Sequence, residues 1–163
     1  MNRLVRLLDT ITRVGAVLAS LAMISVVLLI GLEILLRSLF RTSTLIADEY
    51  SGYLMVSIVA FGLGHTLTEE GHIRITLLTS RLSPGKYRLL DTLTSFVGAV
   101  LSAFCTYHSF FMVKDTFSLG MRADSIAETP LFIPQIPVVA GFLFLTIAFV
   151  RRILQNLKPD YSG

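Results

Sequence analysis

The sequence predicts an all-α integral membrane protein that crosses the membrane four times. Only 15% of its 163 residues are charged, 53% are hydrophobic, and the mean hydropathy is +0.73. Soluble domains carry about 25% charged residues, so this chain has too few charges to cover a water-facing surface. The charges also leave four long uncharged stretches, at residues 14–32, 50–68, 92–113 and 129–150. Because a helix needs about 20 apolar residues to cross the hydrocarbon core, each stretch predicts one transmembrane helix.

Composition also excludes most other classes of protein. A soluble enzyme, a disordered chain and a nucleic-acid binder are all more polar than this sequence. The one cysteine, Cys105, rules out an intrachain disulfide and a cysteine-based zinc site. The sequence shows no phosphate-binding loop, nucleophile arrangement or metal-ligand cluster. We therefore expect one membrane domain over residues 1–163 that is not an enzyme and holds no cofactor.

Lysine and arginine are distributed unevenly on the two sides of the predicted membrane. Ten of the 14 lie in the two terminal tails or between the second and third helices, and four lie in the other two connections. Positive residues favour the cytoplasmic side, so both termini are predicted to be cytoplasmic. Anchoring beside anionic membrane lipids also accounts for the sequence pI of about 9.3 without any nucleic acid.

The first helix is predicted over residues 14–37. Its apolar run is longer than that of a secretory signal peptide, so we interpret it as an uncleaved anchor. Before it, Leu4, Leu7, Leu8 and Ile11 recur at helical spacing. This pattern predicts an N-terminal amphipathic segment on the membrane surface. The alternative is that the first helix simply extends into the cytoplasm.

Glu33 is the residue of the first helix that would be most costly to expose to lipid. Arg37 follows it by four residues, which is the favourable order for an ion pair on one helix. An interfacial Glu33–Arg37 pair is the structural interpretation, and a contact with a partner helix is the second. A proton-coupling carboxylate is the third, because such a group is expected nearer the midplane.

The second helix is predicted over residues 48–68, with Asp48 and Glu49 at its start. Acidic residues stabilise a helix N-terminus because they cap it and complement its dipole. The functional alternative is that the two carboxylates form a negatively charged docking point for another chain.

The third helix is predicted over residues 84–113, because the serine–proline pair at 83–84 is a typical helix start. The preceding residues 71–78 alternate in hydrophobicity and then adopt helical spacing, and we interpret them as a short interfacial segment. His72 and Arg74 in this segment are the candidate contact residues on the cytoplasmic side.

The fourth crossing is predicted over residues 132–153, and three prolines stand at its start: Pro130, Pro134 and Pro137. Each proline lacks a backbone donor and disfavours helix before it. The helix proper is therefore predicted to begin near Pro137. Part of residues 132–135 is then expected to enter the membrane as irregular backbone.

Small residues recur along one face of the second and third helices. Such stripes let membrane helices approach closely, and packing within this chain is the simplest use for them. The stripes comprise Ser57, Ala60 and Gly64 on the second helix, and Ser95, Gly98 or Ala99, Ser102 or Ala103, and Thr106 on the third.

The histidines do not form a haem or metal site. With the predicted topology, His65 lies near the cytoplasmic end of its helix and His108 near the opposite end, so their depths differ by roughly 15–20 Å. One haem needs two ligands at the same depth. His72 lies in a loop.

Three functional hypotheses remain. The first is a subunit of a larger assembly, and the second is a self-sufficient homodimeric exporter with Glu33 as its proton site. The third is a redox membrane anchor, against which the different depths of the histidines argue.

Several short motifs, in this order and spacing, resemble the small membrane subunit of tripartite ATP-independent periplasmic (TRAP) transporters, the DctQ-like family. The chain departs from the family pattern at Ser38 and in having no tryptophan. The matching segments are Glu33 to Arg37, Ala47 to Glu49 with Tyr53 and Leu54, Gly62 to His65, Gly71 to Arg74, Thr129 and Pro130, Ile133 to Gln135, and Gly141.

The resemblance implies a location in the bacterial inner membrane and two protein partners. One is a large elevator-type permease subunit, which would hold the substrate and sodium sites. The other is a periplasmic binding protein, which would deliver a carboxylate substrate. The small subunit would act as a scaffold beside the moving part. Glu33, Arg37, Asp48 and Glu49 would then make partner or structural contacts on the periplasmic side.

Overall fold

The computed structural model describes residues 2–68 and 83–157, except the side chains of residues 2–7 and 84. Four helices account for most of this part of the chain. Each is long and apolar enough to cross a membrane, so the predicted fold class is confirmed. The helices are α1 (Asn2–Phe40), α2 (Ala47–Thr68), α4 (Pro84–Ser118) and α5 (Phe132–Asn156).

Helix α1 is one continuous helix of 39 residues, so no separate surface segment precedes the transmembrane part. The second alternative, an extended first helix, is the one observed. The N-terminal part of α1 packs on the rest of the protein, since Thr12 is 1% exposed and Asp9 forms an ion pair with Arg151 of α5. The helix ends at Phe40 because Arg41 adopts a left-handed φ of 52°.

Helix α5 begins at Phe132, so the prediction that it starts near Pro137 is wrong. Pro134 is the third helical residue, where a backbone N–H has no partner within the helix anyway. Pro137 lies inside the helix and removes only the bond to Ile133. The apolar side chains of this segment evidently offset that one loss, since packing routinely overrides local propensity.

Helix α4 begins as predicted, with Ser83 at the N-cap and Pro84 in the first turn, although the serine side chain makes no capping hydrogen bond. It continues to Ser118, five residues beyond the predicted end at Val113. The helix then ends at a glycine: Gly120 has a φ of 61°, a left-handed conformation that glycine adopts without steric cost.

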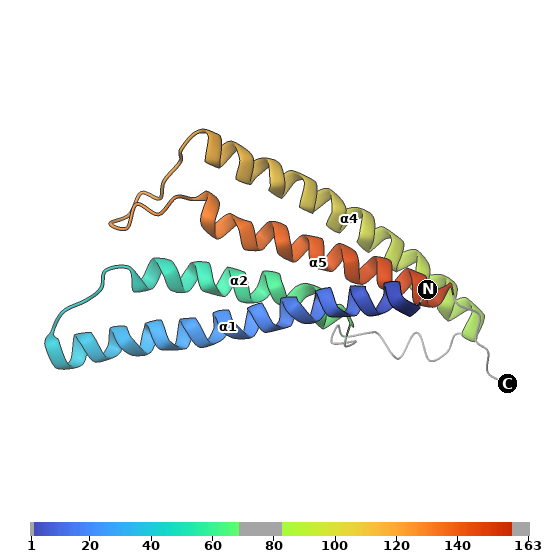
Figure 1. Cartoon of the computed structure of the whole chain (residues 1–163), viewed down its shortest axis with the longest axis horizontal. Coiled ribbons are helices and arrows are strands. Elements are labelled where there is room, and N and C mark those ends of the chain that lie inside the picture. The colour runs from blue at the N-terminus through green and yellow to red at the C-terminus, as the bar shows by residue number, and fades with distance from the viewer. Residues whose placement is uncertain (1, 69–82, 158–163) are drawn as a thin grey trace.

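Helix α5 is the centre of the arrangement. It packs against α4, α2 and α1, and α1 also packs along α2. Figure 1 shows the ribbons in the order α4, α5, α2, α1. They converge at the end where α1 begins and α5 ends, which we call the terminal end. They spread toward the opposite end, which holds the connections 41–46 and 119–131 and which we call the loop end (Figure 1).

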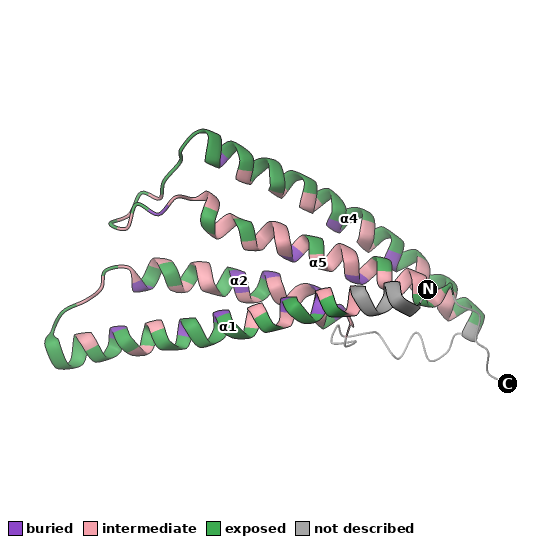
Figure 2. Ribbon diagram, viewed as in Figure 1, coloured by how far each residue is buried: buried purple, intermediate pink, exposed green. Residues whose placement is uncertain are grey.

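Most large apolar residues of the described helices are exposed, and exposed residues are coloured green on the ribbons of Figure 2. Leu28 of α1 is 67% exposed and Phe104 of α4 is 61% exposed. Such exposure would be unfavourable in water, but lipid solvates these side chains. The buried residues are mostly small, which is typical of membrane helices that associate through close backbone contact. The buried apolar residues are Ala22, Val26, Ala47, Ala60, Leu67 and Ala148.

Glycine allows two helix backbones to approach closely in the described part of the chain. A Cβ atom on Gly141 of α5 would lie 2.5 Å from the backbone oxygen of Ala60 in α2. On α2, Gly64 faces the backbone of Phe144 at a similar distance. The small-residue stripe of the second helix thus packs against α5 of the same chain.

The stripe on α4 also faces α5. Gly98 lies under the ring of Phe149, where a Cβ atom would come within 2.4 Å. Ser102 is 4% exposed, and its hydroxyl accepts a hydrogen bond of 3.0 Å from Thr146 of α5. This side of α4 is therefore occupied by its own neighbour, and the opposite side remains outward.

Candidate functional site

The carboxylate of Glu33 is enclosed by hydrogen-bond donors at the loop end. Its Oε1 accepts bonds from Arg37 Nε at 2.6 Å and from Ser43 Oγ at 2.5 Å. Its Oε2 accepts bonds from the backbone N–H of Thr44 at 3.0 Å and from the Thr44 hydroxyl at 2.6 Å. A charge with these partners can be buried at an apolar surface, and Glu33 is only 6% exposed.

This geometry gives Glu33 a structural task that the sequence did not indicate. The carboxylate joins the last turns of α1 to the connection that leads into α2, because two of its partners come from residues 43–44. Arg37 forms the expected ion pair, yet its own side chain is 59% exposed. A contact between Arg37 and a partner protein stays a prediction.

Asp48 and Glu49 occupy the first turn of α2, where negative charge complements the helix dipole. Glu49 accepts a hydrogen bond of 2.7 Å from the hydroxyl of Tyr53, one turn further along the helix. Asp48 lines a shallow hollow at the loop end together with both members of the Glu33–Arg37 pair. Three of the four candidate residues on this side thus lie around one hollow.

The connection between α4 and α5 folds into a hairpin over residues 119–131. Arg122 and Pro130 form an antiparallel β-bridge, and the Glu128 N–H donates to the Ser125 carbonyl at 3.1 Å. The hairpin also touches α2, since Thr129 donates a bond of 3.3 Å to the hydroxyl of Tyr50. The two connections of the loop end are therefore linked through the start of α2.

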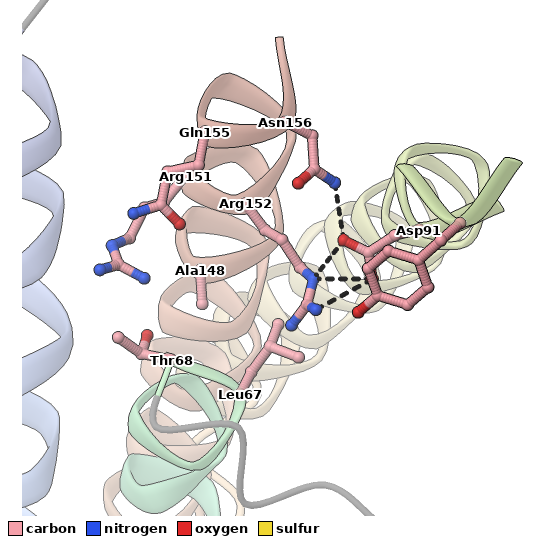
Figure 3. Close-up of a pocket in the computed structure, with 9 residues that line it drawn as sticks. Leu67, Thr68, Asp91, Ala148, Arg151, Arg152, Gln155 and Asn156 are labelled. Atoms are coloured by element: carbon pink, nitrogen blue, oxygen red, sulfur yellow. Dashed lines mark hydrogen bonds and ion pairs between the residues drawn. The ribbon is translucent and has the colours of Figure 1, made fainter. Parts of the chain in front are cut away.

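A second polar cluster lies at the terminal end (Figure 3). Arg152 of α5 binds both carboxylate oxygens of Asp91 in α4, through Nε and Nη2, at 2.9–3.1 Å. Asn156 donates a further bond of 2.6 Å to the same carboxylate, and its own backbone carbonyl accepts a bond from Arg88. The Arg152 and Asp91 side chains are 17% and 15% exposed, so this bidentate ion pair is well shielded from water.

The neighbouring residue Arg151 points to the other side of α5, toward α1 (Figure 3). It forms the ion pair with Asp9. Two consecutive arginines thus bind the helices on either side of α5. Between them lies a pocket of about 180 Å³, lined by Leu67, Thr68, Tyr87, Asp91, Ala148, Arg151, Arg152, Gln155 and Asn156.

The sequence analysis did not single out this terminal-end cluster, although a signal for it was present. Asp91 immediately precedes the third uncharged stretch and Arg151 immediately follows the fourth. With four alternating crossings these two positions lie on the same side of the membrane. Opposite charges at one depth are candidates for an ion pair between helices. The sequence alone does not show which carboxylate each arginine binds, because that depends on which helices are neighbours in the structure.

The remaining candidates give no further site. His72 and Arg74 lie outside the described residues. His108 is on the outer side of α4 and its ring contacts that of Phe104 at a tilt of 54°, whereas His65 is on α2 near the terminal end. Among residues 2–68 and 83–157, no group of three or more histidine, cysteine, aspartate or glutamate side chains lies together in a way that suits a metal ion.

The family of the chain follows from its sequence as a whole. Residues 26–158 match the family model described as "Tripartite ATP-independent periplasmic transporters, DctQ component". The chain belongs to this family. The match runs from the middle of α1 to just beyond α5, so it includes both polar clusters except Asp9. A comparison with curated proteins gave no match. The predicted resemblance to the small permease component of a TRAP transporter is thus confirmed.

The fold also explains one of the family-like segments in physical terms. Gly141 is the point at which α5 touches the backbone of α2, and a side chain there would force the two helices apart. The chain is thus a multi-pass membrane protein of the DctQ family and a small component of a TRAP transporter. Its polar clusters hold helices and connections in place.

Proposed function

We propose that this DctQ-family chain is the scaffold subunit of its TRAP transporter. It would support a large elevator-type permease subunit in sodium-coupled uptake of a carboxylate. A periplasmic binding protein would deliver the substrate, and the sodium ions would bind the large subunit. The chain itself would take no part in covalent chemistry and would bind membrane lipids along its exposed apolar surfaces.

One observation carries this proposal: the charged side chains lie at the two ends of the helices. Each of the four uncharged stretches is 19 or 22 residues long, which leaves no charge near the middle of the membrane to bind an ionic substrate. Transporters that bind such substrates place polar groups or broken helices near the midplane. A subunit built in this way is suited to support a moving partner.

We also propose that the terminal end is cytoplasmic and the loop end periplasmic, in the bacterial inner membrane. The excess of lysine and arginine in the tails supports this orientation. In a Cys105→Ser variant, a single cysteine placed in the hairpin, for example at the exposed Ile126, would then react with a membrane-impermeant maleimide in intact spheroplasts. Labelling that requires lysed membranes would reverse the orientation.

The scaffold role is tested by purification and transport together. Affinity-tagged chain should bring down a large hydrophobic permease from detergent-solubilised membranes at equal stoichiometry. Proteoliposomes that contain both subunits, the binding protein and a sodium gradient should take up substrate, and those that lack this chain should not. Transport by the large subunit alone, or by this chain alone, would contradict the proposal.

A further inference from the structure

The outer side of α4 carries a continuous stripe of aromatic rings. Phe104, Tyr107, His108 and Phe111 follow the spacing i, i+3, i+4 and i+7, which places them on one face of the helix. All four side chains are exposed in the structure. We call this set the aromatic stripe. It lies away from α5, which contacts the small residues on the other side of α4.

The rings of the aromatic stripe contact one another. The His108 ring centre lies 4.3 Å from that of Phe104 and 5.3 Å from that of Tyr107. Tyr107 and Phe111 are 4.7 Å apart, and the ammonium group of Lys114 lies 5.7 Å above Phe111. Neighbouring rings restrict the side-chain rotamers. The stripe is therefore an ordered surface that loses little entropy when another protein covers it.

The imidazole of His108 lies at a depth where lipid cannot satisfy it. The charged residues that flank it along α4 are Asp91 on one side and Lys114 on the other, and His108 is about 8 Å from the midpoint between them at 1.5 Å per residue. The hydrocarbon half-thickness is about 15 Å. His108 has ring contacts but no hydrogen bond to another described residue. An exposed polar ring at this depth is unfavourable in lipid and favours a protein neighbour.

The outward face of α1, on the far side of the bundle from α4, differs in chemistry from the aromatic stripe. The outward face of α1 is aliphatic, with Val27 62% and Leu28 67% exposed, and Gly31 beside them has open space around it. The hydroxyls of Ser20 and Ser25 on this helix donate to the backbone carbonyls of Ala16 and Leu21, four residues earlier. Acyl chains cover such a surface without loss. The two outer helices thus differ in what must cover them.

We propose that the aromatic stripe of α4 is the surface that packs against a membrane helix of the large permease. That helix supplies a hydroxyl, carboxamide or carboxylate group as the hydrogen-bond partner of His108. The inference rests on the proposed function and extends it by naming the helix that meets the partner. Aromatic side chains are enriched at protein interfaces, and polar groups hold membrane helices together.

Photo-cross-linking within the transporter complex tests this placement. Photoreactive benzoylphenylalanine replaces Phe104 or Phe111 on α4 and, as the matched control, Leu28 on α1. Illumination of membranes that contain both subunits should join the α4 probes to the large permease and the α1 probe to lipid. A permease adduct at the α1 probe with lipid adducts at both α4 probes would overturn the inference and leave the scaffold role intact. If no permease co-purifies with any probe variant or with the unmodified chain, both proposals fall.

Substitutions at His108 provide a second test with the same complex. His108→Leu removes the hydrogen-bonding group and should lower the yield of co-purified permease roughly threefold to tenfold, the range expected for one hydrogen bond between membrane helices. His108→Gln keeps a donor and an acceptor and should restore most of it. The amount of folded small subunit, measured by size-exclusion chromatography, controls for stability. Equal permease yields for the leucine variant and the original chain would contradict the inference.

Discussion

The two ends of the helix layer use ionic groups in different ways. At the terminal end, Arg152 binds Asp91 on another helix, and Arg151 binds Asp9 on a third. At the loop end, the partners Glu33 and Arg37 are four residues apart on one helix. Charges therefore join helices at the terminal end, whereas at the loop end they fix the connection that follows α1.

This difference parallels the shape of the protein. Helices that are tied to one another by ion pairs stay together, and the ribbons converge there (Figure 1). At the loop end the hairpin contacts the start of α2 through the hydrogen bond between Thr129 and Tyr50, and the Glu49 carboxylate also lies beside Ser125 and Thr129. The spread of the helices there leaves the connections available to a protein that approaches from outside the membrane. A substitution in one polar cluster should therefore destabilise its own end of the helices and leave the other end unchanged.

The largest effect is expected at the contact that joins α2 to α5, between the two ends. Gly141→Ala places a Cβ atom 2.5 Å from the backbone oxygen of Ala60, and a backbone atom cannot move aside easily. Overpacking of this kind costs about 1–3 kcal/mol of folding free energy. Thermal unfolding in detergent should show a clearly lower midpoint. Gly52→Ala, also within a helix but with open space around it, is the matched control and should not destabilise the protein.

The next effect is expected at the terminal end. Asp91→Asn removes the charge that Arg152 and Asn156 bind and leaves a shielded guanidinium without its counter-ion, at a cost of about 1–3 kcal/mol. Hydrogen exchange should increase in the first turns of α4 and the last turns of α5 but not in residues 41–46. Arg122→Gln breaks an ion pair of 4.0 Å whose side chains are 61% and 73% exposed, and it should have no measurable effect.

A smaller and local effect is expected from Glu33→Gln at the loop end. The amide lacks the charge that holds Arg37, and one of its two polar atoms can no longer accept the bonds from residues 43–44. Amide exchange in residues 41–46 should accelerate while α4 and the end of α5 keep their protection. Faster exchange at the terminal end would show that the two polar clusters are coupled and would contradict their independence.

The smallest effect is expected from Tyr50→Phe, which removes the bond between Thr129 of the hairpin and the Tyr50 hydroxyl of α2 but leaves the Glu49 carboxylate beside Ser125 and Thr129. A single neutral hydrogen bond contributes about 0.5–1.5 kcal/mol, and at 3.3 Å this one should lie at the lower limit. Exchange should rise only in residues 119–131. Tyr107→Phe removes a tyrosine hydroxyl from the outer side of α4 and is the matched control. Amide exchange in the hairpin should remain unchanged in this variant.

Much of the fold was predictable from the sequence because the membrane imposes a simple rule. Uncharged runs of sufficient length must become helices, so all four crossings were found. The ends of the helices were harder to place. The prolines at 134 and 137 do not delay the start of α5, which begins at Phe132. Helix α1 extends back to Asn2 as one helix, and Asp9 within it pairs with Arg151 of α5.

The polar contacts were only partly predictable. The Glu33–Arg37 pair follows from helical spacing within one element. The partners of Asp91 and Asp9 lie more than 60 residues away in sequence, so their pairing depends on which helices are neighbours. Ser43 and Thr44 were also missed, because no periodic pattern marks a loop that folds back on a carboxylate.

The central claim is that this subunit stays fixed while its partner moves, and a reversible lock tests it most directly. Ser102 of α4 and Thr146 of α5 have hydroxyl oxygens 3.0 Å apart, so cysteines at both positions, with Cys105→Ser, should form a disulfide that joins the two helices. Sodium-driven uptake by the reconstituted transporter should proceed at the same initial rate in the oxidised and reduced states. Uptake that stops on oxidation and returns on reduction would contradict a fixed scaffold.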